Sequence, residues 1–176
     1  MKTEFEVKIL DIDVAAVKKK LDGLGAVKVA ERKMRRFVYD IGLEKSHSWI
    51  RLRDNGEKTT LTIKEIHSSE IDGTKEIEVE VSDFDSANSI LNKLGFFPKA
   101  YQENKRVSFR LDGAEVEIDS WPKIPPYVEI EAGSAEKVEK VLNILGFEKS
   151  QATSIGVEEV YKKYGINIHD FKELKF

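Results

Sequence analysis

Charged and apolar residues alternate along several short segments, and this pattern constrains the fold more than any other feature of the chain. Residues 4–10 read Glu-Phe-Glu-Val-Lys-Ile-Leu, and residues 76–81 read Glu-Ile-Glu-Val-Glu-Val. Similar segments lie at 49–53, 60–65, 115–119 and 127–131, while 28–40 and 101–111 are extended with less regular alternation. Successive side chains of a strand point to opposite faces, so each segment predicts a strand with one apolar and one charged face.

Helices are expected between these strands, at 13–24, 84–94, 135–145 and about 155–164. The first three end in Leu-Gly, and glycine suits the left-handed residue that closes many helices. Their apolar stripes need an apolar surface to cover. If the helices cover the apolar face of the sheet from outside, the sheet can curl into a closed barrel with its charged face inward. The predicted class is therefore α+β, with the helices packed outside the barrel.

Length and composition limit the number of domains, the chemistry and the partners that this chain can have. The chain has 176 residues, which fits a single domain spanning 1–176. It contains no cysteine, so disulfides and thiol nucleophiles are excluded. The net charge is −3, without the basic surplus typical of a nucleic-acid binder, so nucleic acid is an unlikely partner. No apolar run approaches a membrane span, so a cytoplasmic protein is expected, either a monomer or a homodimer.

The charges on the strands are sorted by sign. A single alternating strand would usually turn its charged face to water. Here, however, the charges are not mixed at random: arginine pairs and glutamate pairs lie on neighbouring strands, which predicts two functional surfaces. The acidic positions are Glu4, Glu6, Glu76, Glu78, Glu80, Glu117, Asp119, Glu129 and Glu131, and the basic positions are Lys8, Arg51, Arg53, Lys64 and Arg106.

The segment Glu4-Phe-Glu6-Val-Lys8 resembles the Glu-x-Glu-x-Lys signature of the CYTH superfamily, which includes class IV adenylyl cyclases, thiamine triphosphatases and inorganic triphosphatases. The later segments resemble the family's strands in order. They are the arginine strand Arg51-Leu-Arg53, the lysine strand ending at Lys64, the acidic strand Glu78-Val-Glu80, Asp119, and the closing pair Glu129-Ile-Glu131. This resemblance covers nearly the whole chain and implies an eight-stranded antiparallel β-barrel, a triphosphate tunnel with a charged lumen.

One position departs from the family pattern. The family often has two basic residues at alternate positions near 104–110. Arg106 matches the first, but Ser108 stands where the second is expected. Lys105 or Arg110 could compensate, so the register of this strand stays open.

The resemblance also implies roles for the charged residues. Arginine binds phosphate oxygens with two parallel hydrogen bonds and lysine offers a point charge, so the clamp is expected to comprise Lys8, Arg51, Arg53, Lys64 and Arg106. Mg²⁺ and Mn²⁺ prefer oxygen ligands, so the metal ligands are expected to be Glu4, Glu6, Asp119, Glu129 and Glu131. Glu78 and Glu80 are expected to hold the arginines. Lys8 is either a general base with a lowered pKa or one half of a structural ion pair, and with Glu6 it forms the predicted catalytic set.

Three functions are compatible with these residues. The leading one resembles a class IV adenylyl cyclase, which converts ATP to cyclic AMP and pyrophosphate. The second is hydrolysis of inorganic or thiamine triphosphate. The third is a non-catalytic polyphosphate or nucleotide-binding module. An acidic metal set argues against the third function, because binding phosphate requires only the cations.

Overall fold

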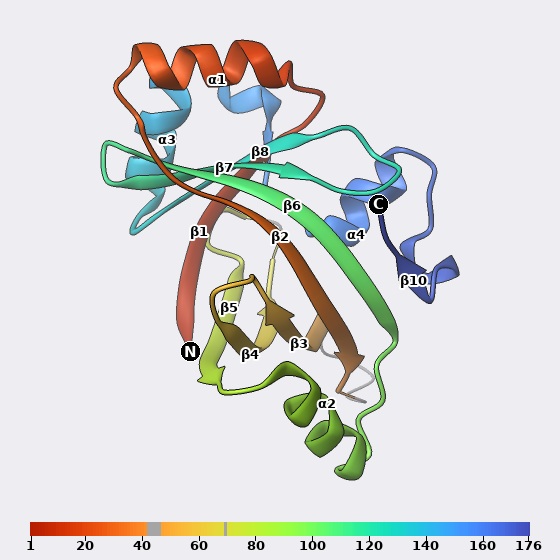
Figure 1. The fold of residues 1–176 in the computed structure, drawn as a ribbon. Coiled ribbons are helices and arrows are strands. Elements are labelled where there is room, and N and C mark those ends of the chain that lie inside the picture. The colour runs from red at the N-terminus through yellow and green to blue at the C-terminus, as the bar shows by residue number, and fades with distance from the viewer. Residues whose placement is uncertain (42–46, 69) are drawn as a thin grey trace.

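Eight antiparallel strands close into a barrel in the computed structural model, which describes residues 1–41, 47–68 and 70–176 (Figure 1). Around the barrel the order is β6, β2, β3, β4, β5, β1, β8, β7 and back to β6. The strands are β1 (Lys2–Ile9), β2 (Val27–Asp40), β3 (His47–Asp54), β4 (Thr59–Ile66), β5 (Thr74–Val81), β6 (Ala100–Leu111), β7 (Ala114–Ser120) and β8 (Tyr127–Ala132). The predicted barrel and its strand number are therefore confirmed.

The helices lie outside the barrel, as predicted (Figure 1). They are α1 (Val14–Gly23), α2 (Phe84–Lys93), α3 (Ala135–Ile144) and α4 (Val157–Lys163). The side chains of Asp13, Asp83 and Ser134 accept hydrogen bonds from backbone N–H groups in the first turns of α1, α2 and α3. The Leu-Gly endings also act as expected, since Gly25 and its two counterparts adopt positive φ angles just beyond the helices. None of the helices in the described ranges is long and apolar enough to cross a bilayer.

The main core lies between the barrel wall and the helices α1 and α3. Val7, Val116 and Ile130 point outward from β1, β7 and β8 and are almost completely buried. They pack against Leu21 of α1 and Val138 of α3. Burying one such side chain contributes about 1.5–3 kcal/mol, so this layer holds the charged face of the same strands toward the interior.

A second core is built from the end of the chain. Trp121, which follows β7, packs edge-on against Tyr161 of α4 at a ring separation of 6.4 Å. Ile168 and Leu174 of the tail are buried in the same cluster. Two further short strands anchor this region: β9 (Ala152–Thr153) pairs with β1, and β10 (Glu173–Leu174) pairs in parallel with β6. The tail thus docks on the barrel, as its apolar residues predicted.

The helices leave part of the barrel wall uncovered. Helix α2 packs on Leu52 and Tyr39, but Ile77 and Val79 on the outer face of β5 remain 51% and 53% exposed. Outward residues were expected to lie beneath helices, and this was wrong for Val79. The alternation of side chains determines which face of the strand a residue lies on. Whether that face is covered depends on the length and position of helix α2, which has only ten residues.

Candidate functional site

A cavity of about 1220 Å³ runs through the barrel and is lined by every second residue of its strands. All but one of the predicted site residues line it. They are Glu4, Glu6 and Lys8 of β1, Arg51 and Arg53 of β3, Lys64 of β4, Glu78 of β5, Arg106 of β6, Asp119 of β7, and Glu129 and Glu131 of β8. We call this cavity the tunnel.

Lys8 and Lys64, the two lysines predicted to bind phosphate, are already paired with carboxylates. Lys8 Nζ lies 2.7 Å from Glu6 and 3.1 Å from Glu129. Lys64 Nζ lies 2.6 Å from Glu4 and 3.4 Å from Glu76. Lys8 and Lys64, both predicted to bind phosphate, therefore each contact at least one predicted metal ligand.

The lowered pKa that the general-base alternative for Lys8 requires does not occur. Burial alone would lower it, but the Glu129 and Glu6 carboxylates outweigh burial and raise the pKa of Lys8 above its ordinary value. Lys8 and Arg106 in turn hold the pKa of Glu129 below its usual range, against the effect of burial. Of the two readings of Lys8, the ion pair is the arrangement found, with the ammonium group protonated.

Arg106 is also saturated by acids. Its Nε donates to Asp119 at 2.7 Å, one terminal nitrogen lies 3.0 Å from Glu129, and another contacts Glu117. The hydroxyl of Ser108 donates to Glu117 at 3.0 Å. Burial raises the pKa of Glu117, and the nearby carboxylates of Glu129 and Asp119 add to this rise despite the Arg106 contact.

The register of β6 is now defined. Asn104, Arg106 and Ser108 line the tunnel. Lys105 points outward and lies over the ring of Phe176, 4.3 Å from its centroid, so it does not replace a tunnel cation. Arg110 lies on the same face of β6 and lines the cavity at the end of the strand, where its side chain is exposed.

The arginines of β3 have fewer carboxylate partners than Arg106 has. Arg51 and Arg53 share Glu78, at 3.3 Å and 3.7 Å, and Thr62 donates a hydrogen bond to the same carboxylate at 2.7 Å. The buried Nε of Arg51 has no partner among the described residues. The positive charge of Arg51, followed by burial, lowers the pKa of Arg53 to about 10. Two guanidinium groups with one carboxylate between them make a site suited to an anion.

Glu80 was predicted to support these arginines together with Glu78, but it lies outside the tunnel. Its carboxylate pairs with Lys58 at 2.8 Å, and its side chain is 67% exposed. Position 80 is near the end of β5, beyond the part of the strand that lines the tunnel. Glu80 therefore does not face the interior, although it alternates correctly with Val79.

The acidic side of the tunnel brings carboxylates into opposition. Glu6 of β1 lies directly across from Glu131 of β8. Burial, followed by the negative charges of Glu4, Glu129 and Glu6, raises the pKa of Glu131 to about 7. Like charges in opposite positions destabilise a sheet unless a cation or a proton lies between them. In the described ranges no three acidic or histidine side chains already converge as a metal cage. Nevertheless, the crowded oxygen donors fit a hard divalent cation.

Arg36 of β2 is a tunnel residue that the strand motifs do not indicate. The side chains of the basic run 32–36 divide between the two faces of the strand. Arg35 points outward to Asp54, whereas Arg36 lines the tunnel beside Arg53, its cross-strand partner. The apolar residues Phe37 and Tyr39, which mark the outer face of β2, are the sequence signal that places position 36 inside.

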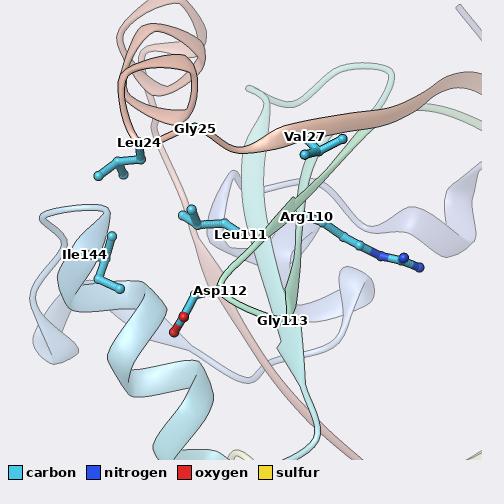
Figure 2. Close-up of a pocket in the computed structure, with 8 residues that line it drawn as sticks. All are labelled: Leu24, Gly25, Val27, Arg110, Leu111, Asp112, Gly113 and Ile144. Atoms are coloured by element: carbon cyan, nitrogen blue, oxygen red, sulfur yellow. The ribbon is translucent and has the colours of Figure 1, made fainter.

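Figure 2 shows a second, smaller depression of about 450 Å³ on the outer surface. It lies between the end of α1, the start of β2, the β6–β7 hairpin and the end of α3, and Arg110 points away from Leu24 and Ile144. Its carboxylate, Asp112, is paired with Lys140 at 2.7 Å. This depression gathers apolar side chains and one neutralised acid, so the tunnel is the stronger candidate site.

Three solved structures share this architecture. A conserved hypothetical protein of Pyrococcus furiosus superposes with a TM-score of 0.75 at 24% identity, covering 88% of this chain and 97% of its own. A candidate adenylate cyclase of Vibrio parahaemolyticus gives 0.77 at 14% identity, covering 92% and 98%. A candidate adenylyl cyclase from Hippeastrum, described as having a dominant triphosphatase activity, gives 0.61 at 17% identity, covering 97% and 100%. At these identities the likeness establishes the fold.

No curated protein matches the sequence. The CYTH domain matches residues 2–155, which include all eight barrel strands and every tunnel residue named above. A match over this much of the chain, joined to the tunnel that it encloses, assigns the chain to the CYTH domain family.

Proposed function

We propose that the tunnel binds the triphosphate of a small molecule and that the protein transforms it with the help of Mg²⁺ or Mn²⁺. The observation that carries this proposal is the pair Arg51 and Arg53, which share the single carboxylate Glu78. A buried excess of positive charge is costly unless an anion compensates it. A triphosphate supplies several charges along a chain, which suits cations set on neighbouring strands.

Glu4, Glu6, Glu129 and Glu131, with Asp119 beside them, are the residues that would hold the metal. The raised pKa of Glu131 supports this assignment, because its cause is a set of carboxylates crowded without enough positive charge between them. A bound divalent ion supplies Lewis-acid stabilisation of charge on phosphate oxygens. The chain's own contribution is to orient the triphosphate through Arg51 and Arg53 and to keep Lys8 protonated.

We favour a class IV adenylyl cyclase-like reaction, in which ATP yields cyclic AMP and pyrophosphate. Hydrolysis of inorganic or thiamine triphosphate is the second candidate, because the similarly folded Hippeastrum protein is described as having a dominant triphosphatase activity. A non-catalytic polyphosphate-binding module is the third. We also propose that residues 1–176 act as one CYTH-like unit, because α4 and the tail pack on Trp121 at the tunnel wall.

Phosphorus NMR of the products distinguishes these candidates. The protein is incubated with Mg²⁺ or Mn²⁺ and, separately, with ATP, inorganic triphosphate and thiamine triphosphate. Pyrophosphate together with cyclic AMP supports the cyclase, whereas orthophosphate released from inorganic or thiamine triphosphate replaces it with the hydrolase. Binding without turnover of any of the three compounds would support the non-catalytic binding module. The absence of both binding and turnover would refute the proposed function.

A further inference from the structure

Arg36 is held by two supports that leave most of its guanidinium group free. The group lies over the ring of Trp121, 4.2 Å from its centroid, and Nε donates to the side-chain oxygen of Gln102 at 3.0 Å. Both supports are buried, at 4% and 6% exposure. In the described part of the chain, the two terminal nitrogens of Arg36 have neither a hydrogen bond nor an ion pair.

The charges around Arg36 are predominantly positive. Arg53 lies opposite it on β3, and Gln102 lies opposite it on β6. Burial and then the positive charge of Arg51 lower the pKa of Arg36 to about 9, and Asp119 offsets this only in part. The three arginines therefore destabilise one another in the substrate-free tunnel, and an anion bound among them would relieve this repulsion.

The neighbouring Arg35 shows how a purely structural arginine is satisfied on the same strand. It too lies over an aromatic ring, that of Phe84, at 4.4 Å, and its Nε also donates one hydrogen bond. Its acceptor, however, is the carboxylate of Asp54, at 3.0 Å. Arg35 is thus neutralised on the outer face, whereas Arg36 has a neutral amide in the equivalent place and faces the tunnel.

We infer that Arg36 is a further arginine of the triphosphate-binding site, supplied by β2 and aimed by Trp121 and Gln102 as positioning residues. This inference rests on the proposed function. Stacking against Trp121 and the bond to Gln102 fix the plane of the guanidinium group and direct its terminal nitrogens to the phosphate oxygens. Because these donors are fixed in advance, little conformational entropy is lost when the anion binds.

The test is calorimetric titration with inorganic triphosphate in the presence of EDTA, so that no metal contributes to binding. Arg36→Ala should weaken binding by about tenfold or more, since a hydrogen-bonded charge pair is worth about 1.5–3 kcal/mol. Arg35→Ala, the matched control, should bind within about twofold of the wild type. Arg36→Lys keeps the charge but loses the paired N–H donors of the guanidinium group, so its affinity should lie between those of the other two variants.

A second readout separates binding from folding. Removing a cation that contacts the anion should make the affinity less sensitive to added salt, which a merely structural change would not do. Gln102→Ala should weaken binding less than Arg36→Ala does and keep the wild-type salt dependence, because the charge remains. If Arg36→Ala does not fold, Arg36→Gln replaces it with the same expectation.

The outcomes distinguish this inference from the proposed function. If the wild type binds no triphosphate in EDTA and none with Mg²⁺ or Mn²⁺ added, the proposed function fails and this inference fails with it; if it binds only with the metal, the same variants are compared with the metal present. If the wild type binds and Arg53→Ala weakens binding, but Arg36→Ala binds as tightly as Arg35→Ala, then the tunnel site stands and the role of Arg36 is overturned.

Discussion

Glu131 is a half-buried carboxylate whose neighbours are mainly of its own sign, and its titration should be visible in the stability of the protein. Its pKa is raised from 4.5 to about 7. The folded state therefore holds this proton more tightly than the unfolded state does. The free energy of unfolding should fall as the pH rises from about 4.5 to 7, with the full loss present above pH 7.

Replacing Glu131 by Gln should remove this loss. One pKa unit corresponds to about 1.4 kcal/mol, so Glu131→Gln should be more stable than the wild type by about 1–3 kcal/mol at pH 8. The advantage should shrink steadily as the pH is lowered to 4.5. Urea unfolding in EDTA across this range measures it, and a variant less stable than the wild type at pH 8 would show that Glu131 is already compensated.

Glu6 and Glu80 provide a matched pair for testing catalysis. Both are glutamates on strands of the barrel, but Glu6 lines the tunnel, whereas Glu80 does not and is paired with Lys58. Glu6→Gln should lower kcat steeply, since groups that stabilise developing charge are worth on the order of 100–1000-fold in rate. Glu80→Gln should leave kcat and KM near the wild-type values. Steady-state kinetics on the substrate identified by NMR decides the point, and a folded Glu6→Gln with wild-type kcat would favour a binding module.

At the scale of single elements, the outer faces of β5 and β8 differ in what covers them. Ile130 of β8 is fully buried beneath the helices, whereas Val79 of β5 is 53% exposed. Ile130→Asp should destabilise the protein by more than about 3 kcal/mol, because it buries an unpaired charge. Val79→Asp should cost less than about 1 kcal/mol. Thermal unfolding of both variants measures the difference, and equal losses would mean that the face of β5 is covered in solution.

The strands and their faces could be predicted because side chains alternate strictly along a strand. Once β1 is recognised, Glu4, Glu6 and Lys8 must share one face. The helices were located equally well, because their caps and Leu-Gly endings are local signals. Contacts across the barrel could not be predicted. They depend on the register between strands and on how far along each strand the tunnel extends, which is why Glu80 was misplaced.

The pairing of opposite charges is likewise a property of the closed barrel rather than of any segment. Lys8 contacts Glu129, which lies 121 positions away in the sequence, and this contact helps to raise the pKa of Lys8 instead of lowering it. Alternation identified both residues as inward-facing. Only the neighbouring positions of β1 and β8 in the barrel reveal that each neutralises the other.

At the scale of the whole molecule, the acidic and basic surfaces share one tunnel, so activity should require a divalent cation. Excess EDTA should abolish turnover, and added Mg²⁺ or Mn²⁺ should restore it, because the carboxylates would otherwise face a polyanion directly. Product formation before and after chelation measures this. Full turnover in excess chelator would contradict the separation of the tunnel into a metal-binding side and a phosphate-binding side.

The salt bridges of the tunnel join the proposed metal ligands to the proposed phosphate ligands. Lys8, Lys64 and Arg106 are neutralised by the carboxylates that a metal would occupy. If the proposed metal bound Glu4 or Glu129, it would release an ammonium or guanidinium group for phosphate, and a phosphate bound to Lys64 would release a carboxylate for the metal. Under the proposed function, each ligand would therefore favour binding of the other, with the same coupling free energy in both directions. Metal and triphosphate should then bind cooperatively, because the same salt bridges must open for both.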